Sequence, residues 1–168
     1  MNGILKRFLG QFGAEAFLPK EMIIERNGEF FLLSPDLKEI SEKNAWWCHA
    51  GTYLGKIRDK RFSPSFPLLF MIVEKAKNRV VVDDKSAWLF ICGRDIFRQG
   101  IIQAAGSIMR GSYTLVLNRH GECLGFGRIV KNLDEASEGV VIKNMFDLGD
   151  FLRRENPAKA KSLNPSKF

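Results

Sequence analysis

Cysteine and histidine are scarce in this sequence, which has three Cys and two His among its 168 residues. The cysteines, at positions 48, 92 and 123, are odd in number and form no Cys-x-x-Cys pair. This spacing argues against a disulfide framework or a zinc knuckle and is typical of a reducing compartment. Cys48 and His49 would point to opposite faces of a strand, and His120 falls in a turn. We therefore expect free thiols, no metal site and no catalytic histidine.

Long apolar runs are missing as well. No run reaches the roughly 18 residues that a membrane span needs, and the first seven residues lack the apolar core of a signal peptide. The sequence also lacks paired catalytic carboxylates and a Cys/His pair at a workable spacing. We expect no membrane anchor, no catalytic residue, no cofactor and no small-molecule substrate. The expected location is the cytoplasm, or the nucleus or nucleolus if the source is eukaryotic.

Apolar content and positive charge are both plentiful. Hydrophobic residues make up 45% of the chain and include 14 Phe, enough to build a folded core. The formal net charge is +7, from 26 basic and 19 acidic residues. A basic globular protein often binds an acidic partner, and nucleic acid is the commonest one. A basic protein that is merely soluble is the alternative at this point.

The first half of the chain alternates helix and strand patterns. Apolar residues recur with helical spacing near the N-terminus, and Asn27-Gly28 between two apolar runs is a strong hairpin signal. Ser34 and Pro35 favour the start of a second helix. The expected elements are a helix over residues 4–12, a hairpin over 22–33, a helix from 34, a strand over 45–56 and a helix over 66–77. The inward side chains expected on the last two helices are Leu37, Ile40, Leu69, Phe70 and Val73.

One stretch of this half superficially resembles a phosphate-binding loop. It reads Gly51-Thr52-Tyr53-Leu54-Gly55-Lys56, with three residues between the glycines in place of four. Ile57 stands where such a loop needs Ser or Thr. We therefore reject nucleotide binding and assign the stretch to a strand.

The second half predicts many short strands with glycine breaks. Asp83 and Asp84 suit a helix N-terminus, and Gly93 suits a helix end. Residues 111–130 are predicted to form a hairpin, in which Gly125 and Gly127 let a neighbouring backbone approach. The other expected elements are a strand over 79–82, a short strand framed by Gly106 and Gly111, a last strand over 140–142 and a closing helical turn over 147–154. Together they suggest a small closed β-barrel flanked by helices.

The predicted fold class is α+β, in two domains and a tail. An N-terminal α/β domain covers residues 1–78, and a β-pseudobarrel flanked by helices covers residues 79–155. Residues 156–168 are predicted to be a basic, flexible tail.

The second half resembles a PUA domain, a small RNA-binding pseudobarrel. The resemblance is carried by the sequence VVVDD, a helix ending in FICG, the segment 94–101 and the hairpin ending in LGFG. The segment 51–56 and the ending DLGDFLRRE resemble the Nip-seven ribosome-biogenesis factors, with their pre-PUA and PUA domains. The tail makes the chain more similar to the archaeal members.

This resemblance implies a non-enzymatic RNA-binding factor that acts in maturation of the large ribosomal subunit. The implied partners are RNA, above all pre-rRNA, and ribosome-assembly or RNA-processing proteins. The alternative is an accessory or RNA-targeting subunit of a tRNA- or rRNA-modifying enzyme.

The family is expected to hold RNA with the first PUA helix, the strand after it, and the last strand with its continuation. In this chain that implies contacts from Arg94 and Arg98, with Gly93 and Gly100 exposed so that a phosphate can reach the backbone. The tail cations predicted to bind RNA are Arg153, Arg154, Lys159 and Lys161, with Lys167 beyond them. A secondary contact with RNA or protein is expected from Lys56, Arg58, Lys60 and Arg61. Solvated charge is the alternative for each group.

Overall fold

A computed structural model describes residues 3–43 and 50–150 of the chain. The chain divides into two compact units, Met1–Lys77 and Asn78–Phe168. The first part of the predicted strand over residues 45–56, namely residues 45–49 with Cys48 and His49, lies outside the described residues. The part of the predicted helical turn over 147–154 that follows residue 150 lies outside them too, and so does the whole tail. The domain boundaries drawn at residues 78 and 155 stay predictions.

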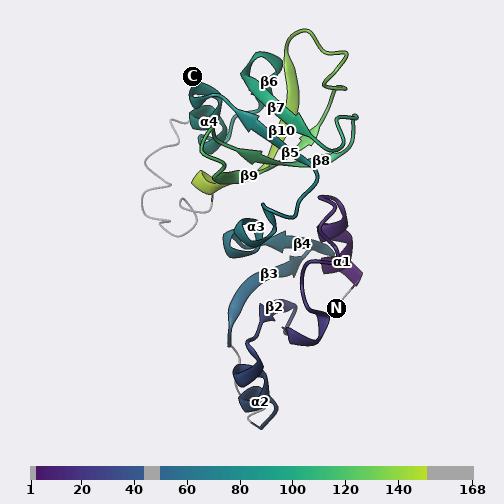
Figure 1. Cartoon of the computed structure of the whole chain (residues 1–168), viewed down its shortest axis with the longest axis vertical. Coiled ribbons are helices and arrows are strands. Elements are labelled where there is room, and N and C mark those ends of the chain that lie inside the picture. Colours follow the sequence, from purple (N-terminus) through teal and green to yellow (C-terminus); the bar gives the residue numbers. More distant parts are fainter. Residues whose placement is uncertain (1–2, 44–49, 151–168) are drawn as a thin grey trace. The chain divides into compact units, whose positions relative to one another are not determined.

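The first unit is built on a four-stranded antiparallel meander (Figure 1). The strands run in the order β1-β2-β3-β4, so that each pairs with the next along the chain. The predicted hairpin is confirmed, with Asn27 and Gly28 at positive φ between its strands. The strands are β1 (Ile23–Arg26), β2 (Glu29–Leu32), β3 (Thr52–Arg58) and β4 (Arg61–Pro64), and a short 3-10 helix, η1 (Lys20–Met22), precedes them.

Three helices accompany this sheet, namely α1 (Gly3–Gly10), α2 (Pro35–Lys43) and α3 (Phe66–Ile72). In Figure 1, α3 lies along β3 and α1 lies beside β4, while α2 extends beyond the end of β2. Leu5, Leu9 and Leu69 are fully buried and form part of the core. Ser34 accepts a hydrogen bond from the Leu37 backbone at 3.3 Å, which confirms the predicted start of α2.

Two of the side chains predicted to point inward are exposed. Ile40 on α2 is 40% exposed and Phe70 on α3 is 51% exposed. A helical spacing of apolar residues defines a face, but it does not show how much of that face the rest of the fold covers. The predictions for Ile40 and Phe70 were therefore wrong, whereas Leu69 is buried as expected.

The stretch from Gly51 to Lys56 lies at the start of β3, which confirms its assignment to a strand. Thr52 begins β3, and Lys56 pairs with Glu29 on β2 and with Ser63 on β4. A Cβ atom added at Gly51 would overlap the Leu32 carbonyl oxygen, and one at Gly55 would overlap the Ser63 carbonyl oxygen. The two glycines therefore serve close strand packing.

The second unit is a curved six-stranded sheet (Figure 1). Its order is β6-β10-β9-β8-β5-β7, and the pair β5–β8 is parallel. The strands are β5 (Arg79–Val82), β6 (Ile96–Phe97), β7 (Ile101–Ala105), β8 (Tyr113–Leu117), β9 (Cys123–Ile129) and β10 (Val140–Asp147). The order makes β6 and β7 the two edges, so the sheet is an open half-barrel and the predicted closed barrel was wrong.

Helix α4 (Asp84–Ile91) packs on this sheet through Ala87 and Phe90, which are buried in the core of the unit. The Asp83 carboxylate accepts a hydrogen bond of 2.7 Å from the Ser86 backbone. This bond lowers the pKa of the Asp83 carboxyl below its usual range, because it stabilises the ionised form. Gly93 has φ 84° directly after the helix, so both predicted ends of α4 are confirmed.

The predicted hairpin of residues 111–130 is confirmed as β8 and β9. Its turn holds Gly121 at φ 80°, and the Asn118 side chain accepts hydrogen bonds from the His120 and Glu122 backbones. Gly125 and Gly127 are buried where β10 approaches β9 most closely.

Two other predictions for this unit need correction. No strand lies between Gly106 and Gly111, because this segment folds as bends and a turn after β7 has ended at Ala105. The last strand is longer than predicted, since β10 continues beyond Ile142 to Asp147 and pairs with β9 over most of that length.

Candidate nucleic-acid interface

The loop that follows α4 is tied to the middle of β10. The Asn144 side chain donates to the Phe90 carbonyl oxygen at 2.8 Å, and its backbone donates to the Asp95 carboxylate at 2.9 Å. Asp95 also forms an ion pair of 3.4 Å with Lys143. These contacts fix the position of the loop that carries Arg94. The Arg94 side chain itself is exposed.

The outer side of α4 presents an exposed stripe beside this loop. Lys85, Trp88, Leu89 and Cys92 follow the spacing i, i+3, i+4, i+7, and all four are exposed. Trp88 is the most exposed large apolar side chain of this stripe, at 67%. We call Trp88, Leu89, Arg94 and Lys143 the α4–β10 surface. It combines two apolar side chains with two cations.

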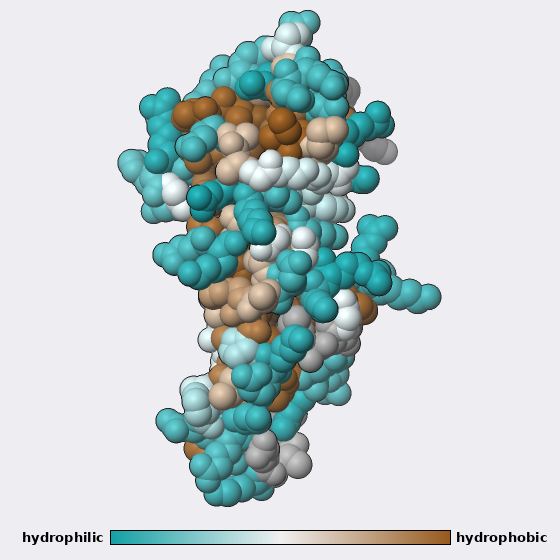
Figure 2. All heavy atoms as spheres, turned by 45° about the vertical axis from the view of Figure 1, so that its right-hand side comes forward, coloured by the Kyte–Doolittle hydropathy of each residue, from teal (hydrophilic) through white to brown (hydrophobic). Residues whose placement is uncertain are grey.

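More apolar side chains are exposed elsewhere on the second unit. In Figure 2, apolar residues of this unit reach the surface among hydrophilic ones. The exposed large apolar residues on other elements of the unit are Phe97, Ile102, Met109 and Met145. Sequence reasoning missed these residues, and it missed Trp88 and Lys143 as well. Alternation in a strand and spacing in a helix assign residues to faces without showing which face stays open.

Arg98 does not join Arg94. Its guanidinium Nε donates to the Leu133 carbonyl oxygen at 3.0 Å, and its backbone donates to the Gly139 carbonyl oxygen at 2.9 Å. The side chain is half-buried and holds the connection between β9 and β10. Arg98 therefore makes a contact within the fold, near the start of β10. Arg94 instead lies beside the middle of β10, near Asn144.

The prediction that Gly100 is exposed was wrong. Gly100 is buried at the end of the 3-10 helix η2 (Arg98–Gly100), and an added Cβ atom would overlap the Ser86 hydroxyl on α4. Its carbonyl oxygen accepts a hydrogen bond of 2.9 Å from the Asp83 backbone. Gly93, in contrast, is exposed as expected.

The remaining predicted contacts lie elsewhere. Arg153, Arg154, Lys159 and Lys161 fall outside the described residues. Lys56, Arg58, Lys60 and Arg61 lie on the β3–β4 hairpin of the first unit, where Asp59 and Lys60 form the turn at positive φ. Lys56 forms an ion pair with Glu29, with its Nζ atom 3.8 Å from the Glu29 Oε1 atom. The other three cations of this run are exposed.

Side chains that could bind a metal ion are not clustered in the part of the chain that the structure describes. Among these residues no group of three or more His, Cys, Asp or Glu side chains is placed to hold a metal ion. No helix within residues 3–43 and 50–150 is long and apolar enough to cross a membrane. Cys92 and Cys123 are free thiols, as predicted, while Cys48 is not described.

Comparison with known proteins places this geometry in a family. The UPF0113 PUA domain model matches residues 78–156. A UPF0113 protein of Archaeoglobus fulgidus is 30% identical over 160 residues, which cover 90% of each chain. The chain belongs to the UPF0113 family. Its second unit is therefore a PUA domain, and the match identifies no catalytic domain beside it.

Two solved structures share the fold of this UPF0113 chain. A hypothetical protein from Pyrococcus horikoshii has a TM-score of 0.55 at 17% identity and covers 92% of this chain and 91% of its own. A conserved PUA domain protein from Thermoplasma acidophilum has a TM-score of 0.52 at 16% identity, with 79% of each chain covered. These likenesses concern the fold alone. The predicted α+β class with a C-terminal PUA pseudobarrel is confirmed.

Proposed function

We propose that this protein is a non-enzymatic RNA-binding factor of the Nip-seven type, which acts in the maturation of the large ribosomal subunit. The observation that carries the proposal is the α4–β10 surface of the PUA domain, where exposed Trp88 lies on the helix that leads to Arg94. Single-stranded RNA is held by aromatic faces on which bases stack and by cations that contact the phosphates. This surface offers both.

The proposed site extends along the chain beyond β10. Asp147 ends that strand three residues after Asn144, whose contacts position the Arg94 loop. The chain then continues into the segment that holds five basic residues and one acidic residue between positions 151 and 168. We include four of them in the RNA site and call them the tail cations: Arg153, Arg154, Lys159 and Lys161. Arg98 is a weaker part of the proposal, because its guanidinium already binds a carbonyl oxygen.

The basic run of the first unit is proposed as a separate contact. Arg58, Lys60 and Arg61 are exposed at one end of the β3–β4 hairpin. A ribosome-assembly protein with an acidic surface, or a second stretch of RNA, would match this charge. Lys56 contributes less because it is close to Glu29.

Two variants are expected to weaken RNA binding in different ways. W88A/R94A removes a stacking face worth about 1–3 kcal/mol, so its affinity should fall about tenfold, and most of this loss should persist at high salt. Its slope of log affinity against log salt should fall by only about 0.7, because one phosphate contact is lost. Changing the tail cations to alanine should reduce that slope by at most about 3. The measurement is fluorescence anisotropy with a labelled single-stranded RNA over a salt series.

Matched controls for this titration come from the first unit. F70A/R7A removes an exposed aromatic ring and an exposed arginine, and should leave both affinity and slope unchanged. Melting curves should stay close to wild type, since exposed substitutions usually change stability by less than about 0.5 kcal/mol. Equal binding by W88A/R94A and by its control would remove the α4–β10 surface from the site.

Crosslinking in cells tests the biological part of the proposal. The full-length protein is crosslinked to RNA in its source cells, and the bound RNA is sequenced. Enrichment of the precursor of the large-subunit rRNA is expected. Enrichment of tRNA, or of RNA at modification sites, would instead favour the alternative of an RNA-targeting subunit for a modification enzyme.

A further inference from the structure

A row of polar side chains crosses the outer face of the PUA sheet. Tyr113 on β8 pairs with Arg128 on β9, and Arg128 pairs with Lys143 on β10. Direct cross-strand partners point to the same face of a sheet, with Cβ atoms about 5 Å apart. Arg128 and Lys143 are exposed and Tyr113 is half-buried. Arg128 therefore stands next to Lys143, a member of the α4–β10 surface.

Two further cations flank this row at the end of β9. Arg110 lies in the turn before β8, where its backbone donates to the Asn132 side chain at 2.8 Å. Gly111 follows it at φ 95° and donates to the Ile129 carbonyl oxygen at 2.8 Å, which holds this turn against the end of β9. Lys131 comes two residues after Ile129. We call Arg110, Arg128 and Lys131 the β9 cation cluster.

The charges of this cluster are not neutralised within the part of the chain that the structure describes. No carboxylate there lies within 4.0 Å of the Arg110, Arg128 or Lys131 cations, although other cations of the described residues, such as Lys56, Arg119 and Lys143, do form ion pairs. All three side chains are exposed. The Arg128 guanidinium comes within 4.0 Å of a Cβ atom added at Gly111, the neighbour of Arg110, and cations on one surface repel one another unless an anionic partner neutralises them. The cluster is thus suited to a polyanion.

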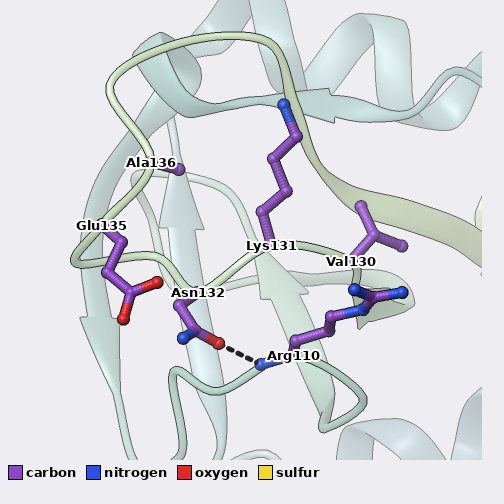
Figure 3. A pocket seen from close by; sticks show the side chains of 6 residues that line it. All are labelled: Arg110, Val130, Lys131, Asn132, Glu135 and Ala136. Carbon is purple, nitrogen blue, oxygen red and sulfur yellow. Dashed lines mark hydrogen bonds between the residues drawn. The ribbon is translucent and has the colours of Figure 1, made fainter.

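A depression of about 400 Å³ is lined by two members of the cluster, Arg110 and Lys131. Its walls come from Arg110, Val130, Lys131, Asn132, Glu135 and Ala136. Figure 3 shows the Arg110 guanidinium beside Val130, and the Glu135 carboxylate on the opposite side of Asn132. The acidic group therefore stands apart from the Arg110 cation. The volume is within the range of pockets that hold a small ligand, and Val130 and Ala136 offer apolar surface to a flat ring.

We propose that the β9 cation cluster is a second RNA contact, which holds the phosphates of a single strand that continues from the α4–β10 surface. Lys143 connects the two, since it pairs with Arg128 in register and contacts Asp95 beside the Arg94 loop. The strand passes from Lys143 to Arg128 and on to Arg110 and Lys131. One of its nucleotides sits at the depression. This inference rests on the proposed RNA binding and extends the site over the outer face of the sheet.

The arrangement favours a nucleic-acid strand over an isolated small anion. Arg128 and Lys143 are direct partners on neighbouring strands, whereas Arg110 and Lys131 lie in the loops before β8 and after β9. The four cations are therefore spread over strands and loops and are not arranged around one phosphate group. A nucleic-acid backbone carries one phosphate at every nucleotide, so successive phosphates can contact the four cations one after another. Guanidinium groups, of which the cluster has two, also bind phosphate in a bidentate fashion.

Binding of single-stranded RNA of two lengths tests the inference on the full chain. R110Q/R128Q/K131Q should reduce the slope of log affinity against log salt by about 2 for a 20-nucleotide RNA, because three phosphate contacts are lost. For a 6-nucleotide RNA, which is long enough for only one of the two surfaces, the change should be much smaller. K6Q/R7Q/K20Q is the matched control: it removes three exposed positive charges from the first unit and should leave both slopes unchanged.

The outcomes separate this inference from the proposed function. If wild-type protein does not bind RNA of either length, the proposed function fails and the inference fails with it. If wild type binds while the triple variant and its control have the same slope for the 20-nucleotide RNA, the inference is overturned and the proposed function stands. Should the triple variant melt early, R110Q/K131Q changes only loop residues, and its expected slope reduction is about 1.4.

Discussion

The substitution Gly125→Ala is expected to destabilise the PUA domain by about 3–5 kcal/mol, from backbone strain and overpacking together. Gly125 has φ 142°, a conformation that side-chain-bearing residues rarely adopt. Its added Cβ atom would overlap the Phe146 carbonyl oxygen on the neighbouring β10. Neither strand can move easily, because Gly125 is also paired with Val116 on β8. Urea unfolding, followed by circular dichroism, would measure the loss.

Gly121→Ala is the matched control for this substitution. Gly121 also has a positive φ, 80°, but nothing lies within 4 Å of an added Cβ atom in its exposed turn. Only the strain of a positive φ remains in this variant, so the free energy of unfolding should fall by about 1 kcal/mol. Equal costs for the two variants would show that the close approach of β10 to β9 contributes nothing.

Alkaline conditions are expected to destabilise the protein through Cys123. Burial raises the pKa of its thiol to about 12, because the thiolate would lose its hydration. Above about pH 9 the unfolded chain releases this proton while the native state keeps it. The free energy of unfolding should therefore fall by about 1.4 kcal/mol for each pH unit between pH 9 and 12. Below pH 9 the Cys123 thiol is protonated in both the folded and the unfolded chain, so its contribution to the free energy of unfolding is fully present.

The variant C123A should lack this part of the pH dependence. Between pH 9 and 11 its stability should fall by about 2–3 kcal/mol less than that of wild type, measured by urea unfolding with a reductant present. C92A is the control: it removes an exposed thiol and keeps the buried Cys123 thiol, so the loss of stability that Cys123 causes between pH 9 and 11 should remain. Parallel curves for wild type and C123A would contradict a strongly raised pKa.

Local signals were sufficient to predict much of the secondary structure. Asn27-Gly28 predicted the first hairpin because both residues accept a positive φ, and Asp83 predicted the start of α4 because its side chain caps the helix. The glycines of β9 were understood as points of close approach before their neighbours were known. The hairpin turn and the helix cap depend on residues that are close together in the sequence, and the glycines of β9 indicated a close approach without showing which strand makes it.

Predictions that depend on distant residues were less successful. Arg98 looks like a free surface cation, but its partner, Leu133, lies far along the chain on another connection. Gly100 looks exposed until Ser86 of α4 is placed above it. The row of Tyr113, Arg128 and Lys143 exists only once the register of three strands is known. A single sequence carries none of this information, because register and covering elements are set by the whole fold.

The position of β10 affects when this protein can fold during synthesis. β10 is the last strand among the described residues and yet lies inside the sheet, between β9 and β6. A nascent chain that ends before Val140 has already made β6 but lacks the strand that pairs with it. The first unit differs, since every strand there pairs with the one made just before it. The meander can thus form as it leaves the ribosome, whereas the PUA domain completes its sheet only after its own C-terminal strand has emerged.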